Sequence, residues 1–180
     1  TMKMMKKLMA VALAGVMALT LLAGCGNPYA LSVKEIMNYI EDENPVVLDY
    51  NRRKPSVTLK AAADTDAVTL AGLLNDAITA EDNQRRSETE ILRQCQTVLE
   101  EKLPPQDGEY VAASYVKVPA AESETIKKLT NYSVATSLIN NKIQLSDASA
   151  EDGSEGTISI CIRKIGNTDY VFAVIRTPGV

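Results

Sequence analysis

Two strand-like runs near the C-terminus constrain the fold more than any other part of the chain. Residues 157–165 and 169–177 are rich in Ile, Val and aromatic side chains, and only a Gly-Asn-Thr connection separates them. Gly and Asn adopt positive φ readily, so this spacing predicts an antiparallel hairpin. The first run carries apolar side chains on both of its faces: Ile158, Ile160 and Ile162 on one, Cys161 and Ile165 on the other. A strand of that kind usually lies in a sheet that is covered on both sides.

The chain before the hairpin is predicted to be mostly helical. Apolar side chains recur every three or four residues, and Ser32 and Ser87 each precede a glutamate by three positions, which indicates helix N-termini. The predicted helices cover residues 33–40, 56–78, 87–103 and 123–140, and the predicted strands cover 45–48, 110–118 and 143–145. We therefore expect one α+β domain over residues 31–180. Its expected arrangement is a three-layer α-β-α domain with N-terminal helices and a C-terminal antiparallel hairpin.

The first 25 residues differ in character from the rest. Three lysines within residues 3–7 precede an uncharged apolar run over 8–22, and the motif LAGC follows at 22–25. The run is shorter than the roughly 20 residues that a membrane-spanning helix needs. This segment resembles the signal peptide of bacterial lipoproteins, in which a cysteine follows a Leu-Ala-Gly box. The resemblance implies a signal peptide over residues 1–24 and a lipidated tether over 25–30.

By this resemblance, Cys25 receives a diacylglycerol and becomes the N-terminus of the mature protein. The expected location is the extracytoplasmic face of the bacterial cell membrane. Two acyl chains anchor a protein stably, whereas one chain holds it weakly. The alternative is an ordinary signal peptide, or a membrane helix with an incidental cysteine.

The charge of the remaining chain restricts its partners. Without the signal peptide, 156 residues hold 16 Lys and Arg against 23 Asp and Glu, a formal net charge of −7. Such an acidic surface disfavours binding to nucleic acid and adhesion to anionic lipid by charge. Membrane attachment is therefore expected through the diacylglycerol on Cys25 alone.

Cys95 and Cys161 are the two cysteines that remain. An extracytoplasmic location permits a disulfide between them, although the sequence does not determine connectivity. Cys95 lies in an apolar helical stripe and Cys161 in a predicted strand. Two separate buried thiols are therefore the alternative.

The absence of histidine excludes most catalytic chemistry. Histidine is the commonest general base and metal ligand, and the chain has none. The sequence also lacks a paired-cysteine motif and a phosphate-binding glycine loop, so we expect no metal and no cofactor. Residues 146–156 are acidic but do not match a calcium-binding loop. Two carboxylates suffice for glycoside hydrolysis, and the candidates are Glu109 with Asp107 or Asp64 with Asp66. The alternative is that these are solvated surface groups.

Four tyrosines stand out in a chain with one Phe and no Trp: Tyr110, Tyr115, Tyr132 and Tyr170. They either line a ligand groove with their polar tips outward, or pack at the edge of the core. Together with the carboxylate candidate, they suggest a tentative cleft formed by Glu109, Tyr110 and Tyr115.

Three stretches carry a second resemblance that covers nearly the whole mature chain. TLKAAADTDAVTLAGLL is alanine-rich, GEYVAASY precedes the helical stretch SETIKKLTNYSVATSLINN, and ISICIRKIGNTDYVFAVI forms the predicted hairpin. In this order they resemble the second helix, the Gly-Glu-Asn segment with its helix, and the closing hairpin of the CAP superfamily, the cysteine-rich secretory or SCP-like domain. The resemblance implies helices on both faces of the sheet.

The departures from that family concern its metal site. Family members surround a central cavity with two histidines and two acidic residues. Only Glu109 is carried over here; Tyr110 replaces the asparagine, and Thr136 or a neighbour stands where the second histidine falls. The first histidine has no counterpart, so the resemblance implies a degenerate CAP-like module without the metal site.

Two functions from different classes fit the sequence. The first is a membrane-anchored extracytoplasmic lipoprotein whose domain binds a ligand or partner of the cell envelope without catalysis. The alternative is a cell-envelope hydrolase that uses carboxylates, with Glu109 as its acid. An enzyme of that kind requires two carboxyl groups that face each other about 5–10 Å apart across a cleft.

Overall fold

The computed structural model describes residues 31–48, 53–80, 85–118 and 124–180. The predicted signal peptide, the tether and Cys25 lie outside these residues. Within the described ranges, no helix combines the length and the apolar character that are needed to cross a membrane.

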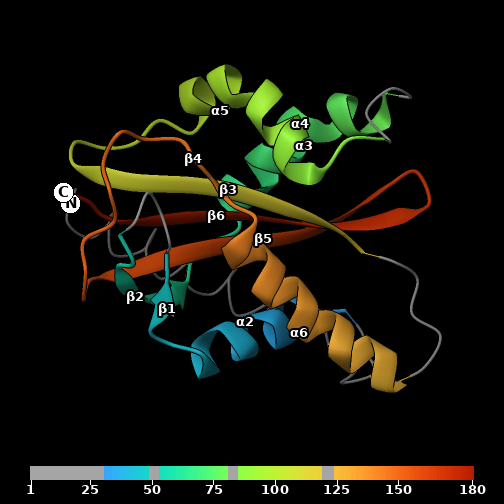
Figure 1. Ribbon diagram of the computed structural model, residues 1–180. Helices are drawn as coiled ribbons and strands as arrows, with labels where there is room; N and C mark the ends of the chain where they lie inside the picture. Colours follow the sequence, from blue (N-terminus) through green and yellow to red (C-terminus); the bar gives the residue numbers. More distant parts are fainter. Residues whose placement is uncertain (1–30, 49–52, 81–84, 119–123) are drawn as a thin grey trace, which may run out of the picture.

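A mixed six-stranded sheet runs through the centre of the domain (Figure 1). Its strands are β1 (Val46–Val47), β2 (Ser56–Ala61), β3 (Glu109–Val118), β4 (Ile143–Gln144), β5 (Glu155–Ile165) and β6 (Thr168–Pro178). They lie in the order β1-β2-β5-β6-β3-β4. Only β2 and β5 pair in parallel, whereas every other neighbouring pair is antiparallel. The predicted C-terminal hairpin is confirmed as β5 and β6, and Gly166 at its turn has a φ of 61°.

Helices cover both faces of this sheet, so the predicted α+β class and its three layers are confirmed (Figure 1). One face carries α2 (Val33–Asp42) and α6 (Glu124–Asn140). The other carries α3 (Thr65–Thr79), α4 (Glu88–Gln94) and α5 (Gln96–Lys102). We call the face under α2 and α6 the groove face, because a groove lies between these two helices, and the face under α3, α4 and α5 the closed face.

Alternation along the strands builds a separate hydrophobic core on each face. Successive side chains of a strand point to opposite sides of a sheet. On β3, Tyr110 and Ala112 therefore belong to the cluster of the groove face, whereas Val111, Ala113 and Tyr115 belong to the closed face. This two-sided burial accounts for strands that are apolar on both faces in the sequence.

The two serines predicted as caps do cap helices. Ser32 Oγ accepts a hydrogen bond from the backbone N–H of Glu35 at 3.1 Å, at the start of α2. Ser87 Oγ accepts one from Glu90 N–H at 3.3 Å, at the start of α4. Each bond satisfies one of the backbone donors that a helix N-terminus leaves free.

The predicted helix over residues 56–78 is wrong at its beginning. Residues 56–61 form the strand β2, and the helix begins only at Thr65. Val57 and Leu59 are buried at a spacing of two, and Leu59 matched the helical pattern of the residues after it by coincidence. The strand is stabilised by parallel pairing with β5, almost a hundred residues away, which local periodicity does not reveal.

The predicted helix over residues 87–103 is two helices, α4 and α5, joined at Cys95. Cys95 leaves the helical region, with φ −92° and ψ 0°, and its N–H is shared between the carbonyls of Ile91 and Leu92. Both helices still bury apolar side chains against the same cluster, Leu92 from α4 and Leu99 from α5. The apolar pattern therefore correctly predicted which side of this segment is buried, but it did not predict the break between α4 and α5.

Candidate functional site

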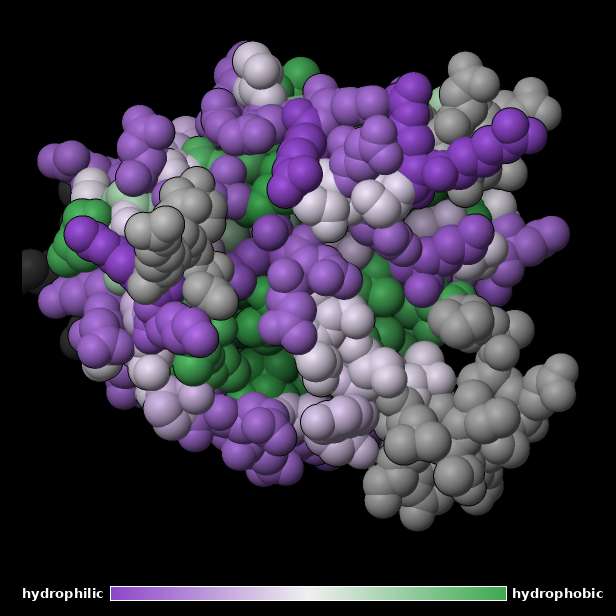
Figure 2. All heavy atoms as spheres, viewed as in Figure 1, coloured by the Kyte–Doolittle hydropathy of each residue, from purple (hydrophilic) through white to green (hydrophobic). Residues whose placement is uncertain are grey.

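A groove with a volume of about 320 Å³ lies between α2 and α6 and is closed at one end by β1. Its floor is apolar and consists of Ile40, Val46, Ala135 and Ile139, all buried. Figure 2 shows this apolar surface set back between hydrophilic rims in the lower half of the molecule. The volume is at the lower end of the range for small-molecule pockets.

Hydrogen bonds that join two asparagine side chains to the backbone hold the walls of the groove in place. The side chain of Asn131 on α6 accepts a hydrogen bond from Ser32 N–H at 3.1 Å, which ties the start of α2 to α6. At the other end of α2, the amide of Asn44 pairs with the backbone of Leu59, donating at 2.9 Å and accepting at 3.0 Å. The chain that leaves α2 is thereby fixed to β2, and β1 stays at the rim of the groove.

An aromatic pair forms one wall. The rings of Tyr39 on α2 and Tyr132 on α6 have centroids 5.5 Å apart and planes at 78°. Tyr132 is 46% exposed, as is Val47 on the opposite rim. Because most large apolar and aromatic side chains of the described residues are buried, two exposed ones on one groove mark it as a candidate binding surface.

The charge within the groove is negative. Among the described residues, Glu43 is the only charged one that lines it, and this side chain makes no hydrogen bond or ion pair with any of them. Glu43 follows Glu41 and Asp42 at the carboxyl end of α2, whose last turn contains no basic residue. The partial negative charge of a helix C-terminus adds to these carboxylates.

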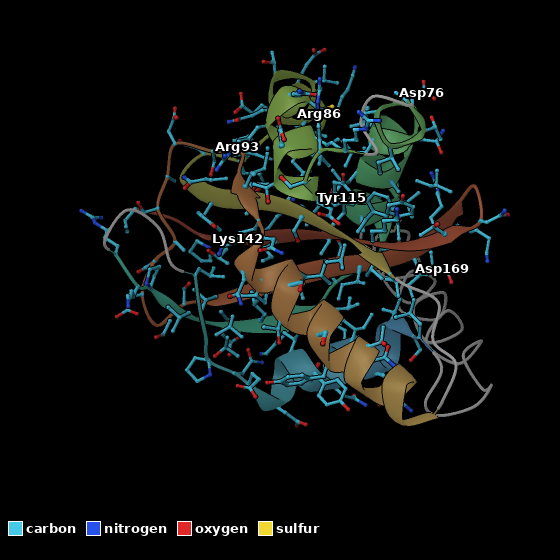
Figure 3. The ribbon with its side chains drawn as sticks, turned by 45° about the vertical axis from the view of Figure 1, so that its right-hand side comes forward. Asp76, Arg86, Arg93, Tyr115, Lys142 and Asp169 are labelled. Carbon is cyan, nitrogen blue, oxygen red and sulfur yellow. The ribbon has the colours of Figure 1, made fainter. Side chains whose placement is uncertain are left out.

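The carboxyl end of α6 is already compensated. Lys142 Nζ donates a hydrogen bond to the carbonyl of Ile139 at 2.9 Å, and Figure 3 shows Lys142 beside the end of this helix. The uncompensated negative end at the groove is therefore that of α2.

Glu109, the sequence candidate for a catalytic acid, is part of an ion-pair network instead. Arg176 Nη1 donates to Glu109 Oε2 at 2.8 Å, and Arg176 Nε donates to Asp66 Oδ2 at 2.6 Å. Burial alone would lower the pKa of Arg176, but hydrogen bonds and charge from Asp66 and Glu109 raise it overall. Glu109 and Asp66 thus come from different predicted carboxylate pairs. The guanidinium of Arg176 lies between them, where a hydrolase would need an open cleft for its substrate.

The tentative cleft of Glu109, Tyr110 and Tyr115 does not form. Tyr110 is buried in the core of the groove face, and Tyr115 in that of the closed face. Figure 3 shows Tyr115 on the side of the sheet that carries α3 and α4. Glu109 and Tyr115 lie six residues apart along β3, which at 3.4 Å per residue is roughly 20 Å.

The four conspicuous tyrosines therefore divide between the two expected roles. Tyr110, Tyr115 and Tyr170 are core residues, and Tyr115 stacks on Phe172 with centroids 5.6 Å apart. Tyr132 lines the groove. The sequence did not single out Tyr39, the ring partner of Tyr132. Tyr39 precedes Ile40 in a predicted helix, but no local pattern indicates that this helix packs against α6.

Cys95 and Cys161 are both free thiols, which is the arrangement of separate thiols that the sequence left open. Both pack against the core of the closed face. Burial raises the pKa of Cys161 to about 11 and also raises that of Cys95. Raised values keep both groups as unreactive thiols at neutral pH.

The acidic loop over residues 146–156 shows no sign of metal ligation. Across the described part of the chain, no group of three or more Cys, Asp or Glu side chains is placed to hold an ion. Asp152 instead accepts a hydrogen bond from Ser56 N–H at 2.8 Å, which fastens this loop to β2.

Comparison with known proteins gives no family for the chain. It matches no protein-family model, no curated protein and no solved structure.

Proposed function

We propose that this protein is a membrane-anchored lipoprotein of the bacterial envelope whose α+β domain binds a ligand in the groove between α2 and α6. The observation that carries the proposal is the groove itself, with an apolar floor and an exposed aromatic rim. The LAGC motif ending at Cys25 supports the location and the lipid anchor.

The composition of the groove favours binding over catalysis. Acid–base hydrolysis by carboxylates needs two of them facing each other, and Glu43 is the single carboxylate among the described residues that line the groove. The chain has no histidine to take the second role. Glu109 and Asp66 are each bound to Arg176 and lie outside the groove, so the hydrolase alternative gains no support.

A degenerate CAP-like module remains the most specific form of this proposal. Helices on both faces of the sheet and a closing β5–β6 hairpin are in keeping with it. Among the family's site residues only Glu109 is carried over, and its carboxylate is bound to Arg176.

Occupancy of the groove in living cells tests the proposal. We would replace Val47 on the groove rim, which is 46% exposed, by cysteine in the full-length chain, and in a second variant replace Val98 on α5, which is similarly exposed at 48%. Maleimide labelling is then compared between intact cells and purified protein, with the wild-type chain as background for its own cysteines. We expect Val47→Cys to react at least several-fold more slowly in cells than in purified protein, and Val98→Cys to react equally in both. Equal rates for Val47→Cys in cells and in purified protein would contradict the proposal.

A further inference from the structure

The groove combines three features: an aromatic corner, a carboxylate without a partner among the described residues, and an apolar floor. Tyr39 and Tyr132 pack edge to face with planes at 78°, and together they form this corner as one wall of the groove. Glu43 lies on the same groove without an ion-pair partner among the described residues. Each feature selects one property of the ligand.

The charge selects a cation. Of the described residues that line the groove, only Glu43 is charged, and Glu41 and Asp42 precede it at the negative end of the α2 dipole. An anionic ligand would meet like charge here, because no basic side chain is found among the described lining residues. The acidic balance of the whole chain adds to the same preference.

The rings and the floor select an organic cation over a metal ion. Tyrosine faces attract ammonium groups through the ring quadrupole, and aromatic corners of this kind recognise quaternary ammonium ions. Ile40, Ala135 and Ile139 offer apolar contact to carbon-bound hydrogens, which a hydrated metal ion cannot use. No set of several carboxylates, as a metal would need, is found at the groove or elsewhere in the described residues.

We infer that the groove binds a small soluble organic ammonium ion, held against the aromatic pair of Tyr39 and Tyr132 with Glu43 as its counter-ion. This inference rests on the proposed function, since it names the ligand class of the same groove. The volume of about 320 Å³ accommodates a free solute with a handful of carbon atoms.

Three probes of nearly equal size and different charge test this inference. Choline is the cation, 3,3-dimethylbutan-1-ol is its neutral counterpart with carbon in place of nitrogen, and 3,3-dimethylbutanoate is the anion. Saturation-transfer NMR with the full-length chain in a non-ionic maltoside detergent measures the binding of each. We expect choline to bind about five- to tenfold more tightly than the alcohol, and the anion to bind most weakly.

Variants assign the selectivity to the named residues. Glu43→Gln keeps the size of the side chain. It should weaken the binding of choline by about threefold and leave the binding of the alcohol unchanged. Tyr132→Leu keeps an apolar wall and should remove most of the preference for choline. Val98→Ala, on the far side of the sheet, should change the binding of neither choline nor the alcohol.

The outcomes separate this inference from the proposed function. Equal binding of choline and the alcohol would overturn the ammonium assignment and leave a binding groove in place. Tighter binding of the anion would overturn it as well. Absence of binding by all three probes, together with unprotected Val47→Cys in cells, would overturn both.

Discussion

The two faces of the sheet bury similar amounts of apolar residues but treat their aromatic side chains differently. On the closed face, Tyr115 and Tyr170 are buried around Phe172. On the groove face, Tyr39 and Tyr132 meet at the surface and leave a cavity beside them. The comparison separates aromatic residues that stabilise the fold from those that are available to a ligand.

The difference follows from how many elements cover each face. Three helices pack on the closed face, where α3 contributes Ala67, Leu70, Ala71 and Leu74 without exposure. Of the described helices, α2 and α6 alone cover the groove face, and the short strand β1 fills part of the gap between them. A binding surface is thus left where the sheet has fewer covering elements.

The largest effect is expected from truncating an aromatic residue of the closed face. Tyr115→Ala leaves a cavity in a packed cluster and should lower the free energy of unfolding by about 3–5 kcal/mol, measured by urea denaturation. Tyr115→Phe is the control and should cost far less, because it keeps the stacking ring. A loss below about 1 kcal/mol for Tyr115→Ala would show that this face is not tightly packed.

Breaking the Arg176 network should have the next largest effect. Arg176→Met leaves the carboxylates of Asp66 and Glu109 without their shared partner, and should cost about 2 kcal/mol of stability. Lys60→Met is a matched control: its pair with Glu155 has the same 2.8 Å distance as that of Glu109, but both side chains are more than half exposed. It should cost at most about 0.5 kcal/mol. Equal losses would mean that the Arg176 network is no more than a surface contact.

Alkaline pH should weaken the closed face through Cys161. Burial raises the folded-state pKa of Cys161 to about 11, against 9.0 for an ordinary thiol. As the pH rises, the Cys161 thiol therefore loses its proton in the unfolded chain before it does so in the folded protein. The stability difference that favours the protonated, folded state is unaffected below pH 9 and decreases as the pH rises to 11. We expect a loss of about 1 kcal/mol between pH 7 and pH 10 that is missing in Cys161→Ala. Identical pH profiles for the two proteins would refute the burial of this thiol.

Truncating the aromatic wall of the groove should hardly affect stability. Tyr132→Ala should change the free energy of unfolding by less than about 0.5 kcal/mol, because this side chain is nearly half exposed. Ligand binding should nevertheless be lost. A stability loss comparable to that of Tyr115→Ala would make Tyr132 a core residue and remove the distinction between the faces.

Removing the lipid acceptor should leave both faces unchanged and alter only the location. Cys25→Ser should leave the precursor uncleaved or unlipidated, whereas the wild-type protein should partition into the detergent phase of Triton X-114. The urea midpoints of the two proteins should agree. Normal processing and detergent partitioning of Cys25→Ser would refute the lipoprotein assignment.

Features that depend on neighbouring residues could be predicted from the sequence. The β5–β6 hairpin has a short turn at Gly166, and the caps at Ser32 and Ser87 act over three residues, so local pattern is sufficient. Strand β2 was missed because its main partner, β5, lies far along the chain.

The groove was missed for the same physical reason. It exists because α2 and α6 pack side by side, and Ser32 and Asn131, which tie them together, are 99 residues apart. Tyr132 stands out in the sequence by its residue type, whereas the carboxylate pair needed for hydrolysis and the CAP resemblance both direct attention to Glu109. The contact with Arg176 that makes Glu109 structural is another long-range pairing.

One measurement tests the contrast between the faces most directly. Val47→Cys on the groove rim and Val68→Cys on α3 are labelled with maleimide in intact cells, each with Tyr132 present and with Tyr132→Ala. We predict that Val47→Cys is protected only when Tyr132 is present, and that Val68→Cys reacts at the same rate in both backgrounds. Protection of Val47→Cys that persists in the Tyr132→Ala background, or no protection in either, would contradict a ligand held in the groove by its aromatic wall.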